Sequence, residues 1–316
     1  TGFPNGNPNV WLRDSFKRGM KLIVVDPRRS DAAAKSHLHL QAVPGHDPEI
    51  LASIIKVVID EELFDREFVT ENVTGLDGLR SAVAGFTPER VADAAGLDAD
   101  DIVLAARMFA GAGRGYAFAG TGPSMSARGS LVEYLVLALE TICGHWLRAG
   151  EPVLATPTLL PSPQYRAQAK GPRPWSTDVQ VRVRGLTGTA AGMPTGALAD
   201  EILLPGDGQV RALMSWNGNP ALAFPDQRKV SAALRSLDLL VHIDPFLTPT
   251  ARLADYVIAP TMGLEAVAAT HNLDDLSTRA TGYGSGLAYA NYTPAIVSPP
   301  PDSDLIDEWR FFLELY

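Results

Sequence analysis

Two short polar motifs occur in each half of the chain, in the same order. A Gly-Asn-Pro tripeptide at 6–8 is followed by a predicted helix and by a strand that ends in Asp26, and a hydroxyl residue comes four positions later. The second half repeats this pattern at 218–220 and Asp244. The amides of a tight glycine turn can approach phosphate, and an aspartate at a strand end can accept hydrogen bonds from a sugar or a base. The pattern predicts one nucleotide-type crevice per half, which suits two similar ligands or one ligand with two similar arms.

The elements that must position these motifs follow from the spacing of apolar residues. Helical periodicity predicts helices over 10–18, 48–62, 88–95, 101–110, 130–143 and 226–237. Short β-rich runs predict strands over 21–25, 115–119, 210–216, 239–243 and 256–259. Apolar strands that alternate with helices are typical of parallel sheets covered on both faces, where ligands bind at the carboxyl ends of strands. We therefore expect an α/β fold with helices on both faces of parallel sheets.

The chain has 316 residues, which is long enough for two domains that each bury a core. Between them, the pattern of helices and strands breaks down into a Pro-rich, basic segment. A segment of about 40 residues without periodicity is unusual inside a compact domain. We predict a first α/β domain over 1–150, an irregular linker over 151–189 and a second α/β domain over 190–316, the two domains being related as a weak internal repeat.

Composition excludes several classes of protein. With 27 Lys and Arg against 36 Asp and Glu, the net charge of −9 argues against general binding to nucleic acid or to an anionic membrane. No apolar run reaches the roughly 18 residues that span a bilayer. The single cysteine, Cys143, lies in an apolar helix, where a buried thiol is the ordinary outcome. His37 and His39 share one face of a possible strand without a third ligand nearby, so we predict no metal ligand in this chain.

The repeated motifs belong to a longer series that runs along the whole chain. In order, the series is Gly6-Asn7-Pro8; Val24-Val25-Asp26-Pro27-Arg28-Arg29-Ser30; Pro44-Gly45-His46-Asp47; Gly120-Thr121-Gly122; Met193-Pro194-Thr195; Gly218-Asn219-Pro220; and Asp244-Pro245-Phe246-Leu247-Thr248-Pro249-Thr250-Ala251 with Ala254-Asp255-Tyr256-Val257. This series resembles the molybdopterin oxidoreductase family, the dimethyl sulfoxide reductase class of molybdenum and tungsten enzymes. The order and spacing of the motifs together make the match strong.

The resemblance implies two Rossmann-like domains that hold bis-molybdopterin guanine dinucleotide with molybdenum or tungsten. On this basis Asp26 and Asp244 lie beside a guanosine ribose or base, and Asp47 accepts from guanine N1–H and N2–H₂. The glycine turns bring backbone amides to the diphosphates, and Thr248 and Thr250 offer hydroxyls. The cofactor-binding residues implied are Gly6, Asn7, Pro8, Asp26, Arg28, Ser30, Gly45, Asp47, Gly120, Gly122, Asn217, Gly218, Asn219, Asp244, Thr248, Thr250 and Asp255.

Two of these assignments have structural alternatives. Asp47 would be a helix N-cap if the next helix had Pro48 at its first position. Arg28 and Arg29 follow a strand-end aspartate, and they would either contact phosphate or form salt bridges between the domains. The sequence leaves both pairs of alternatives open.

The sequence departs from the family pattern in two places. A Gly-rich stretch after the long helix here reads Cys-Gly-His-Trp-Leu-Arg-Ala-Gly over 143–150, and a later Glu-x-x-Gly-Thr-x-x-Asn pattern reads Glu-Ala-Val-Ala-Ala-Thr-His-Asn over 265–272. In the family, the protein ligand to the metal and any iron–sulfur cluster lie upstream of the first Gly-x-Asn-Pro, and a C-terminal domain closes over the cofactor. We interpret the chain as the central part of a longer protein and expect it to have no catalytic residue and no turnover alone.

The leading hypothesis is a molybdenum or tungsten oxidoreductase that transfers oxygen atoms, or hydride and electrons, and has a small-molecule substrate and an electron-transfer subunit or carrier as partners. The alternative is a metal-free structural domain like those of the large complex I subunit. Asp26, Asp47 and Asp244 argue against this alternative, because a domain without cofactor does not need them. A nicotinamide-dependent dehydrogenase is disfavoured because no full Gly-x-Gly-x-x-Gly follows a strand. We expect no nucleic-acid partner and no membrane insertion, and both a cytoplasmic and an exported location fit the sequence.

Overall fold

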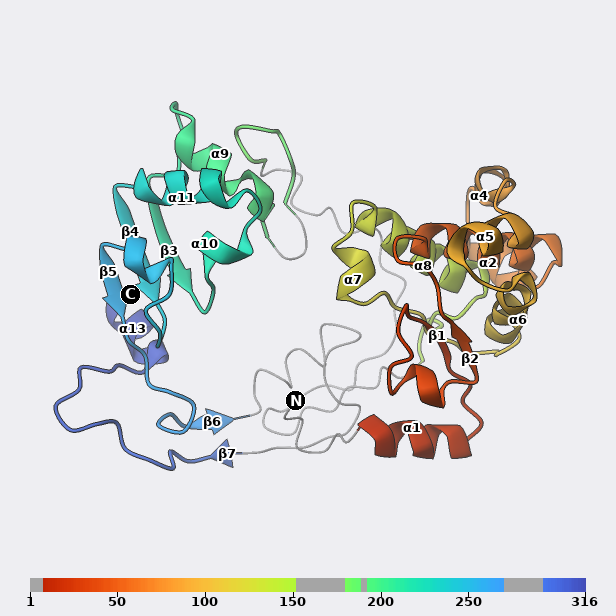
Figure 1. Cartoon of the computed structure of the whole chain (residues 1–316), viewed down its shortest axis with the longest axis horizontal. Coiled ribbons are helices and arrows are strands. Elements are labelled where there is room, and N and C mark those ends of the chain that lie inside the picture. The colour runs from red at the N-terminus through yellow and green to blue at the C-terminus, as the bar shows by residue number, and fades with distance from the viewer. Residues whose placement is uncertain (1–7, 152–179, 189–191, 270–291) are drawn as a thin grey trace. The chain divides into compact units, whose positions relative to one another are not determined.

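The computed structural model describes residues 8–151, 180–188, 192–269 and 292–316. The chain divides into two compact units, Thr1–Glu151 (unit 1) and Pro152–Tyr316 (unit 2), which are described separately below (Figure 1). Most of the predicted linker lies outside the described residues. None of the described helices is long and apolar enough to cross a bilayer.

Unit 1 consists mostly of helices, which pack around α2, and has one short parallel sheet. Its elements are α1 (Pro8–Lys17), β1 (Ile23–Val25), the 3₁₀ helix η1 (Ala33–Lys35), β2 (Leu38–Leu40), α2 (Asp47–Asp60), α3 (Arg66–Asn72), α4 (Leu76–Val83), α5 (Pro88–Ala95), α6 (Ala99–Ala110), α7 (Thr121–Ser124) and α8 (Gly129–Ile142). β1 and β2 pair in parallel, with Val25 opposite Leu40. α2 lies at the centre because it is apolar nearly all round, and it contacts α4, α5, α6 and α8.

Local sequence signals explain where several of these helices begin and end. The side chain of Thr87 accepts a hydrogen bond from the backbone of Arg90 and caps α5, which has Pro88 in its first turn and ends at Gly96 with a φ of 68°. Asp98 caps α6 in the same way. The predicted helix over 88–95 is confirmed, and the other predicted helices are found within a few residues of their predicted bounds.

Unit 2 is built on a three-stranded parallel sheet in the order β3-β4-β5. Its elements are the 3₁₀ helix η2 (Thr195–Ala197), α9 (Leu198–Leu203), β3 (Ala212–Trp216), α10 (Pro220–Ala223), α11 (Gln227–Arg235), β4 (Leu239–Ile243), the 3₁₀ helix η3 (Ala251–Leu253), β5 (Tyr256–Ile258), β6 (Ala268–Ala269), β7 (Tyr292–Thr293) and α13 (Glu308–Leu315). β6 and β7 form a separate antiparallel pair. The mixed α/β architecture with parallel sheets agrees with the prediction.

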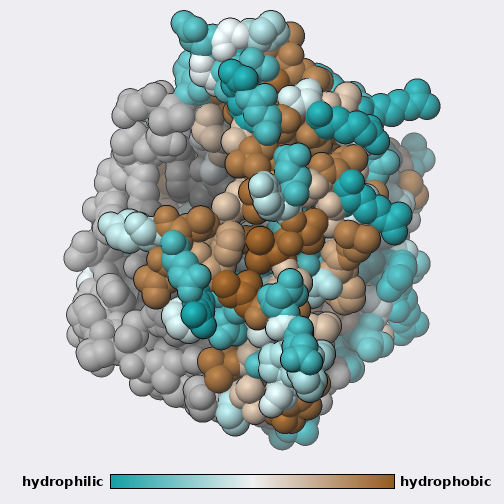
Figure 2. Space-filling view, turned by 90° about the vertical axis from the view of Figure 1, so that its left-hand side faces the viewer, coloured by the Kyte–Doolittle hydropathy of each residue, from teal (hydrophilic) through white to brown (hydrophobic). Residues whose placement is uncertain are grey.

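Helices pack closely on only one face of the β3-β4-β5 sheet among the described elements. Leu213 and Leu240 point toward α9 and α11 and join their apolar core. On the other face, Met214 and Tyr256 are 43% and 63% exposed, and α13 reaches the sheet at Trp216 through Phe312, with ring centroids 5.2 Å apart. Apolar surface is visible on this unit in Figure 2. Among the described elements only α13 reaches this second face, so the expectation of helices covering both faces stays a prediction there.

The strand predicted over 115–119 is also wrong. These residues form neither strand nor helix, because the backbone N–H of Ala117 donates to the Glu140 side chain (2.7 Å to Oε1) instead of to a neighbouring strand. Glu140 is only 6% exposed, and burial raises its pKa although the Ala117 hydrogen bond opposes the shift.

Replacing Glu140 with glutamine should remove one pH dependence of the stability of unit 1. Because the folded-state pKa of Glu140 is raised, its stabilising contribution is complete below the unfolded-state pKa and is lost as the pH rises through the folded-state pKa. A glutamine side chain stays neutral, and its amide oxygen can still accept a hydrogen bond from the backbone N–H of Ala117. In urea unfolding at several pH values, Glu140→Gln should gain stability relative to the wild type from about pH 4 to neutrality, whereas the exposed control Glu67→Gln should not. If the difference in free energy of unfolding between Glu140→Gln and wild type stayed constant across this pH range, the raised pKa of Glu140 would be contradicted.

Candidate functional site

The first Asp-Pro turn (Asp26–Ser30) begins directly after β1. Asp26 Oδ1 accepts from the backbone N–H of Arg28 (2.7 Å), and Asp26 Oδ2 accepts from the Ser30 hydroxyl (3.2 Å). Ser30 N–H donates to the Arg28 carbonyl (2.8 Å), and Ser30 Oγ accepts from the N–H of Ala33, the first residue of η1 (3.4 Å). The side chains of the motif therefore close the turn and start the 3₁₀ helix after it.

The second Asp-Pro turn (Asp244–Thr248) follows β4 and has nearly the same hydrogen bonds. Asp244 Oδ1 accepts from Phe246 N–H (2.8 Å), and Thr248 N–H donates to the Phe246 carbonyl (2.8 Å). Thr248 Oγ1 accepts from the N–H of Ala251, the first residue of η3 (3.1 Å). Where Ser30 bonds directly to its aspartate, Thr248 Oγ1 instead lies 3.0 Å from Nε2 of His242, which is 3.6 Å from Asp244 Oδ2.

Both turns lie at the carboxyl edge of a parallel strand pair. Asp26 N–H donates to the carbonyl of Leu40 at the end of β2, and Asp244 N–H donates to the carbonyl of Ile258 at the end of β5, each at 3.2 Å. This edge is where parallel α/β sheets bind ligands.

The Pro-Gly-His-Asp segment lies at the start of α2. Gly45 has a φ of 97°, which favours glycine, and no atom lies within 4 Å of the position that a Cβ would occupy. The guanidinium of Arg128 holds this segment by donating to the Gly45 carbonyl and to the Glu49 carboxylate. Burial alone would raise the pKa of Glu49, but its hydrogen bond to Arg128 lowers it overall. Arg128 was missed because nothing local in the sequence links it to Gly45.

Asp47 is the first residue of α2, and His46 is at the N-cap position without a side-chain cap. The interpretation of Asp47 as the N-cap is therefore wrong. Its carboxylate forms no hydrogen bond or ion pair with the described residues, and it is half-buried. An unpaired carboxylate beside the open space at Gly45 fits a ligand with two adjacent N–H donors, as guanine has.

The other glycines of unit 1 predicted to bind cofactor lie at α7. Gly120 precedes this short helix and its carbonyl accepts from the backbone and hydroxyl of Ser124, while Gly122 is within the helix. Neither glycine has an atom within 4 Å of its Cβ position, so both leave room for a ligand. Pro8 is the first residue of α1, and the structure does not describe Gly6 and Asn7.

In unit 2, residues 217–219 form the loop between β3 and α10. Asn217 has a φ of 52°, in the left-handed region, and Asn219 is at the N-cap position of α10. Asn219 Oδ1 accepts from the Thr250 hydroxyl (2.6 Å), and Thr250 Oγ1 accepts from Ala221 N–H (3.0 Å). This network joins the loop to the segment that follows the second Asp-Pro turn.

Three predicted ligand residues are instead engaged within the protein. Thr250 is 0% exposed, so its hydroxyl holds the loop at Asn219 and cannot reach a ligand in this conformation. Thr248 Oγ1 is engaged by His242 and the start of η3. Asp255 Oδ2 accepts from Leu240 N–H (2.7 Å) and fastens β5 to β4. The expectation that the Thr250 hydroxyl binds the cofactor is therefore wrong, because this side chain is fully buried, whereas cofactor binding by the half-buried Thr248 and the exposed Asp255 stays a prediction.

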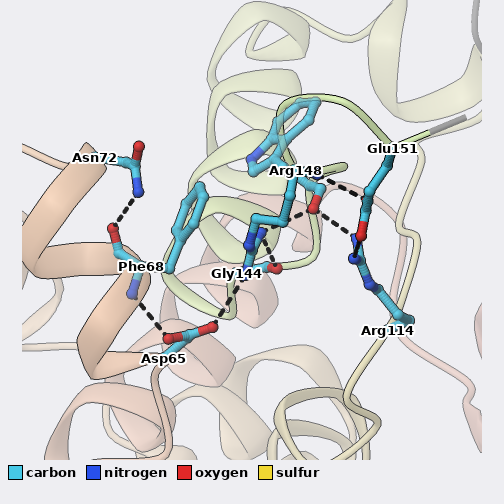
Figure 3. A network of polar contacts seen from close by, with 8 residues as sticks. Asp65, Phe68, Asn72, Arg114, Gly144, Arg148 and Glu151 are labelled. Carbon is cyan, nitrogen blue, oxygen red and sulfur yellow. Dashed lines mark hydrogen bonds and ion pairs between the residues drawn. The ribbon is translucent and has the colours of Figure 1, made fainter. Parts of the chain in front are cut away.

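The stretch at 143–150 is organised by one arginine (Figure 3). The Arg148 guanidinium donates to the carbonyls of Gly144 (2.9 Å) and Trp146 (2.8 Å), forms an ion pair with Asp65 (3.2 Å) and lies 4.3 Å from the centre of the Phe68 ring. Its neighbours Arg114 and Glu151 close the other side of the network. This departure from the family pattern therefore forms an ordered loop.

Replacing Asp65 with alanine should destabilise unit 1 by about 1 to 2 kcal/mol. Asp65 caps α3 through Phe68 N–H, a contact worth about 1 kcal/mol, and its ion pair with Arg148 is partly exposed and adds less than about 1 kcal/mol. The control Asp77→Ala removes only an exposed pair with Arg80. Equal losses for the two variants in urea unfolding would contradict this role for Asp65.

The remaining candidates have ordinary environments. Cys143 is buried, as predicted, and burial raises its pKa to about 12. His37 accepts from Leu22 N–H, and His39 Nε2 contacts the Asp26 carbonyl. No group of three or more His, Cys, Asp or Glu residues in the described part of the chain could hold a metal ion. Arg28 and Arg29 are exposed and form no ion pair with described residues.

Comparison with known proteins identifies the class. The model of the molybdopterin oxidoreductase family matches residues 7–278, which include both Asp-Pro turns. The chain therefore belongs to the molybdopterin oxidoreductase family, as the motif series predicts.

Individual proteins of this class share less than 30% of their aligned residues with this chain in the following comparisons. The chain is 28% identical over 260 residues to the F420-dependent formate dehydrogenase subunit alpha of Methanocaldococcus jannaschii, covering 76% of this chain and 37% of that protein. It is 28% identical over 334 aligned positions to the acetylene hydratase of Syntrophotalea acetylenica, covering 96% and 43%. A solved acetylene hydratase from Pelobacter acetylenicus has the same fold, with a TM-score of 0.71 and 23% identity over 96% of this chain and 44% of that one. The chain thus spans less than half the length of these relatives.

Proposed function

We propose that the chain is the cofactor-binding part of a molybdenum or tungsten oxidoreductase and that it holds bis-molybdopterin guanine dinucleotide. The observation that supports this most is the pair of Asp-Pro turns, Asp26–Ser30 and Asp244–Thr248, with matching hydrogen bonds at the carboxyl edges of parallel strands. Two equivalent turns suit a ligand with two equivalent arms. We infer that units 1 and 2 derive from one Rossmann-like repeat.

Each residue has a defined part in this proposal. Asp47 accepts from guanine N1–H and N2–H₂, because its carboxylate is otherwise unpaired. Asp26 and Asp244 present strand-end carboxylates to the ribose. Gly45, Gly120 and the loop at 217–219 admit the diphosphates at close range. Arg28 adds a positive charge beside the first turn. Bound metal would supply oxygen-atom, hydride or electron transfer, while the chain fixes the position and orientation of the two arms.

The relatives indicate what the complete protein needs. They include formate dehydrogenase alpha subunits, so we propose a small-molecule substrate and an electron-transfer partner subunit or carrier. The metal-free structural domain is not favoured, because the matched proteins are named as dehydrogenases, a hydratase and a nitrate reductase. We propose that an iron–sulfur cluster, where the complete protein has one, is bound by residues outside this chain.

Metal and pterin analysis tests this proposal. The full-length protein that contains this chain would be purified from a host that makes the molybdenum cofactor, grown with molybdate or tungstate. We expect stoichiometric metal and a fluorescent oxidised pterin that stay with the protein through gel filtration. Protein that is folded but contains neither would contradict the proposal.

A further inference from the structure

A fully buried histidine lies beneath the second Asp-Pro turn. His242 is 0% exposed and interrupts an otherwise apolar strand, Leu-Leu-Val-His-Ile. Its Nε2 is 3.0 Å from Thr248 Oγ1 and 3.6 Å from Asp244 Oδ2, so the ring lies between the two side chains that define the turn. A buried polar group is costly unless it is hydrogen-bonded, and these contacts offset part of that cost.

The first turn shows what the histidine replaces. There Ser30 Oγ donates directly to Asp26 Oδ2, and the strand position two residues before the aspartate is Val24. In the second turn the larger imidazole occupies the matching strand position and joins the hydroxyl to the carboxylate. The second turn therefore depends on a strand residue for a connection that the first turn makes by itself.

The same histidine lies next to the loop at 217–219. Its partner in the β3–β4 register is Ser215, which is 7% exposed and whose hydroxyl lies 3.4 Å from the Gly218 carbonyl. On the other side, the segment after Thr248 includes Thr250, which donates to Asn219. The Thr250–Asn219 hydrogen bond thus joins the segment after the second turn to the loop, and Ser215, the strand neighbour of His242, contacts the loop at Gly218.

The imidazole acts here as a neutral hydrogen-bonding group. Burial lowers the pKa of His242, and the Asp244 carboxylate and the Ser215 carbonyl only partly oppose that shift. Both contacts are made by Nε2, so a neutral ring that carries its proton there donates to the Thr248 hydroxyl and directs the same N–H toward the Asp244 carboxylate, while Nδ1 has no hydrogen-bond partner among the described residues.

We propose that His242 is a positioning residue that fixes the second Asp-Pro turn and its neighbouring loop in the conformation that binds the second guanine nucleotide arm. This proposal rests on the proposed function, because it concerns the same site. It predicts an asymmetry between the units: unit 2 depends on His242 and unit 1 has no counterpart of it.

Titration of the chain with GDP, which has the guanosine and diphosphate of one arm, tests this role. We expect wild type to bind two GDP by isothermal titration calorimetry. His242→Val, which introduces the residue of the first repeat, should weaken one site by about tenfold, the value of one hydrogen bond, and leave the other unchanged. His242→Gln places an amide near the position of Nε2 and should restore most of the affinity. Two unaltered sites in a folded His242→Val variant would overturn the proposal.

Two further variants separate positioning from a general loss of stability. Leu240→Val, two residues away on the same face of β4, should lower the melting temperature without changing GDP affinity. In a Thr248→Val background, His242→Val should have little further effect on GDP affinity, since the contact is already lost; fully additive effects would overturn the proposal. Failure of wild type to bind GDP would instead count against the proposed function, and it would leave His242 without a site to position.

Discussion

Replacing Gly129 with alanine is expected to destabilise unit 1 by about 3 kcal/mol or more. A Cβ at this position would lie 1.9 Å from the backbone oxygen of Ser124 and 2.6 Å from its carbonyl carbon. These are backbone atoms, so no side-chain rotation relieves the clash, and α7 or the start of α8 must move. Overpacking typically costs about 1 to 3 kcal/mol and occasionally more, and here the contact involves two helices.

The same substitution elsewhere supplies a matched control. Gly78 lies within α4, has an ordinary helical φ and has nothing within 4 Å of its Cβ position. Gly78→Ala should therefore stabilise the protein by about 0.5 to 1 kcal/mol through helix propensity. Both free energies of unfolding can be measured in urea. A Gly129→Ala variant as stable as wild type would show that α7 and α8 do not pack as described.

Replacing Asp47 with asparagine is expected to weaken guanine binding by about tenfold to a hundredfold. A carboxylate accepts from both N1–H and N2–H of guanine, whereas an amide offers one acceptor and turns its NH₂ toward a donor. A hydrogen bond to a charged group contributes about 1.5 to 3 kcal/mol. Stability should change little, because α2 begins at Asp47 itself and the cap position belongs to His46.

Guanine content at limiting cofactor supply measures this effect. The purified Asp47→Asn variant would be hydrolysed in acid and its released guanine compared with wild type. Asp101→Asn changes an aspartate in the first turn of α6 and should leave guanine content unaltered. Equal guanine in wild type and Asp47→Asn would reject the base-reading role and leave Asp47 as a residue that only favours the helix terminus.

Long, periodic elements could be predicted from the sequence because their own side chains specify them. The strand over 239–243 and the helix over 88–95 are found where the apolar spacing places them. Short helices such as α3 and α4 were missed, since seven or eight residues give little periodicity. The strand predicted over 115–119 failed because Glu140, 23 residues away from Ala117, takes its backbone donor. Contacts of this kind are not encoded locally.

The candidate site likewise has features that the local sequence predicts and features that depend on residues far away in the chain. The Asp-Pro motifs predict the two turns because Asp26 and Asp244 bond to backbone groups only two residues away. The inward direction of Thr250 could not be predicted, as its partner Asn219 is 31 positions away. His242 carried one available signal, a polar residue in an apolar strand at the position of Val24. The loop that Arg148 organises depends on Asp65, 83 positions earlier, and has no local signature.

The ratio of guanine to metal tests the central claim most directly. Holoprotein purified from a host that makes the cofactor would be hydrolysed in acid, with guanine measured by chromatography and molybdenum or tungsten by mass spectrometry. Two matching turns, one in each unit, predict two guanines for each metal atom. A protein that contains metal and pterin but releases no guanine would contradict the account.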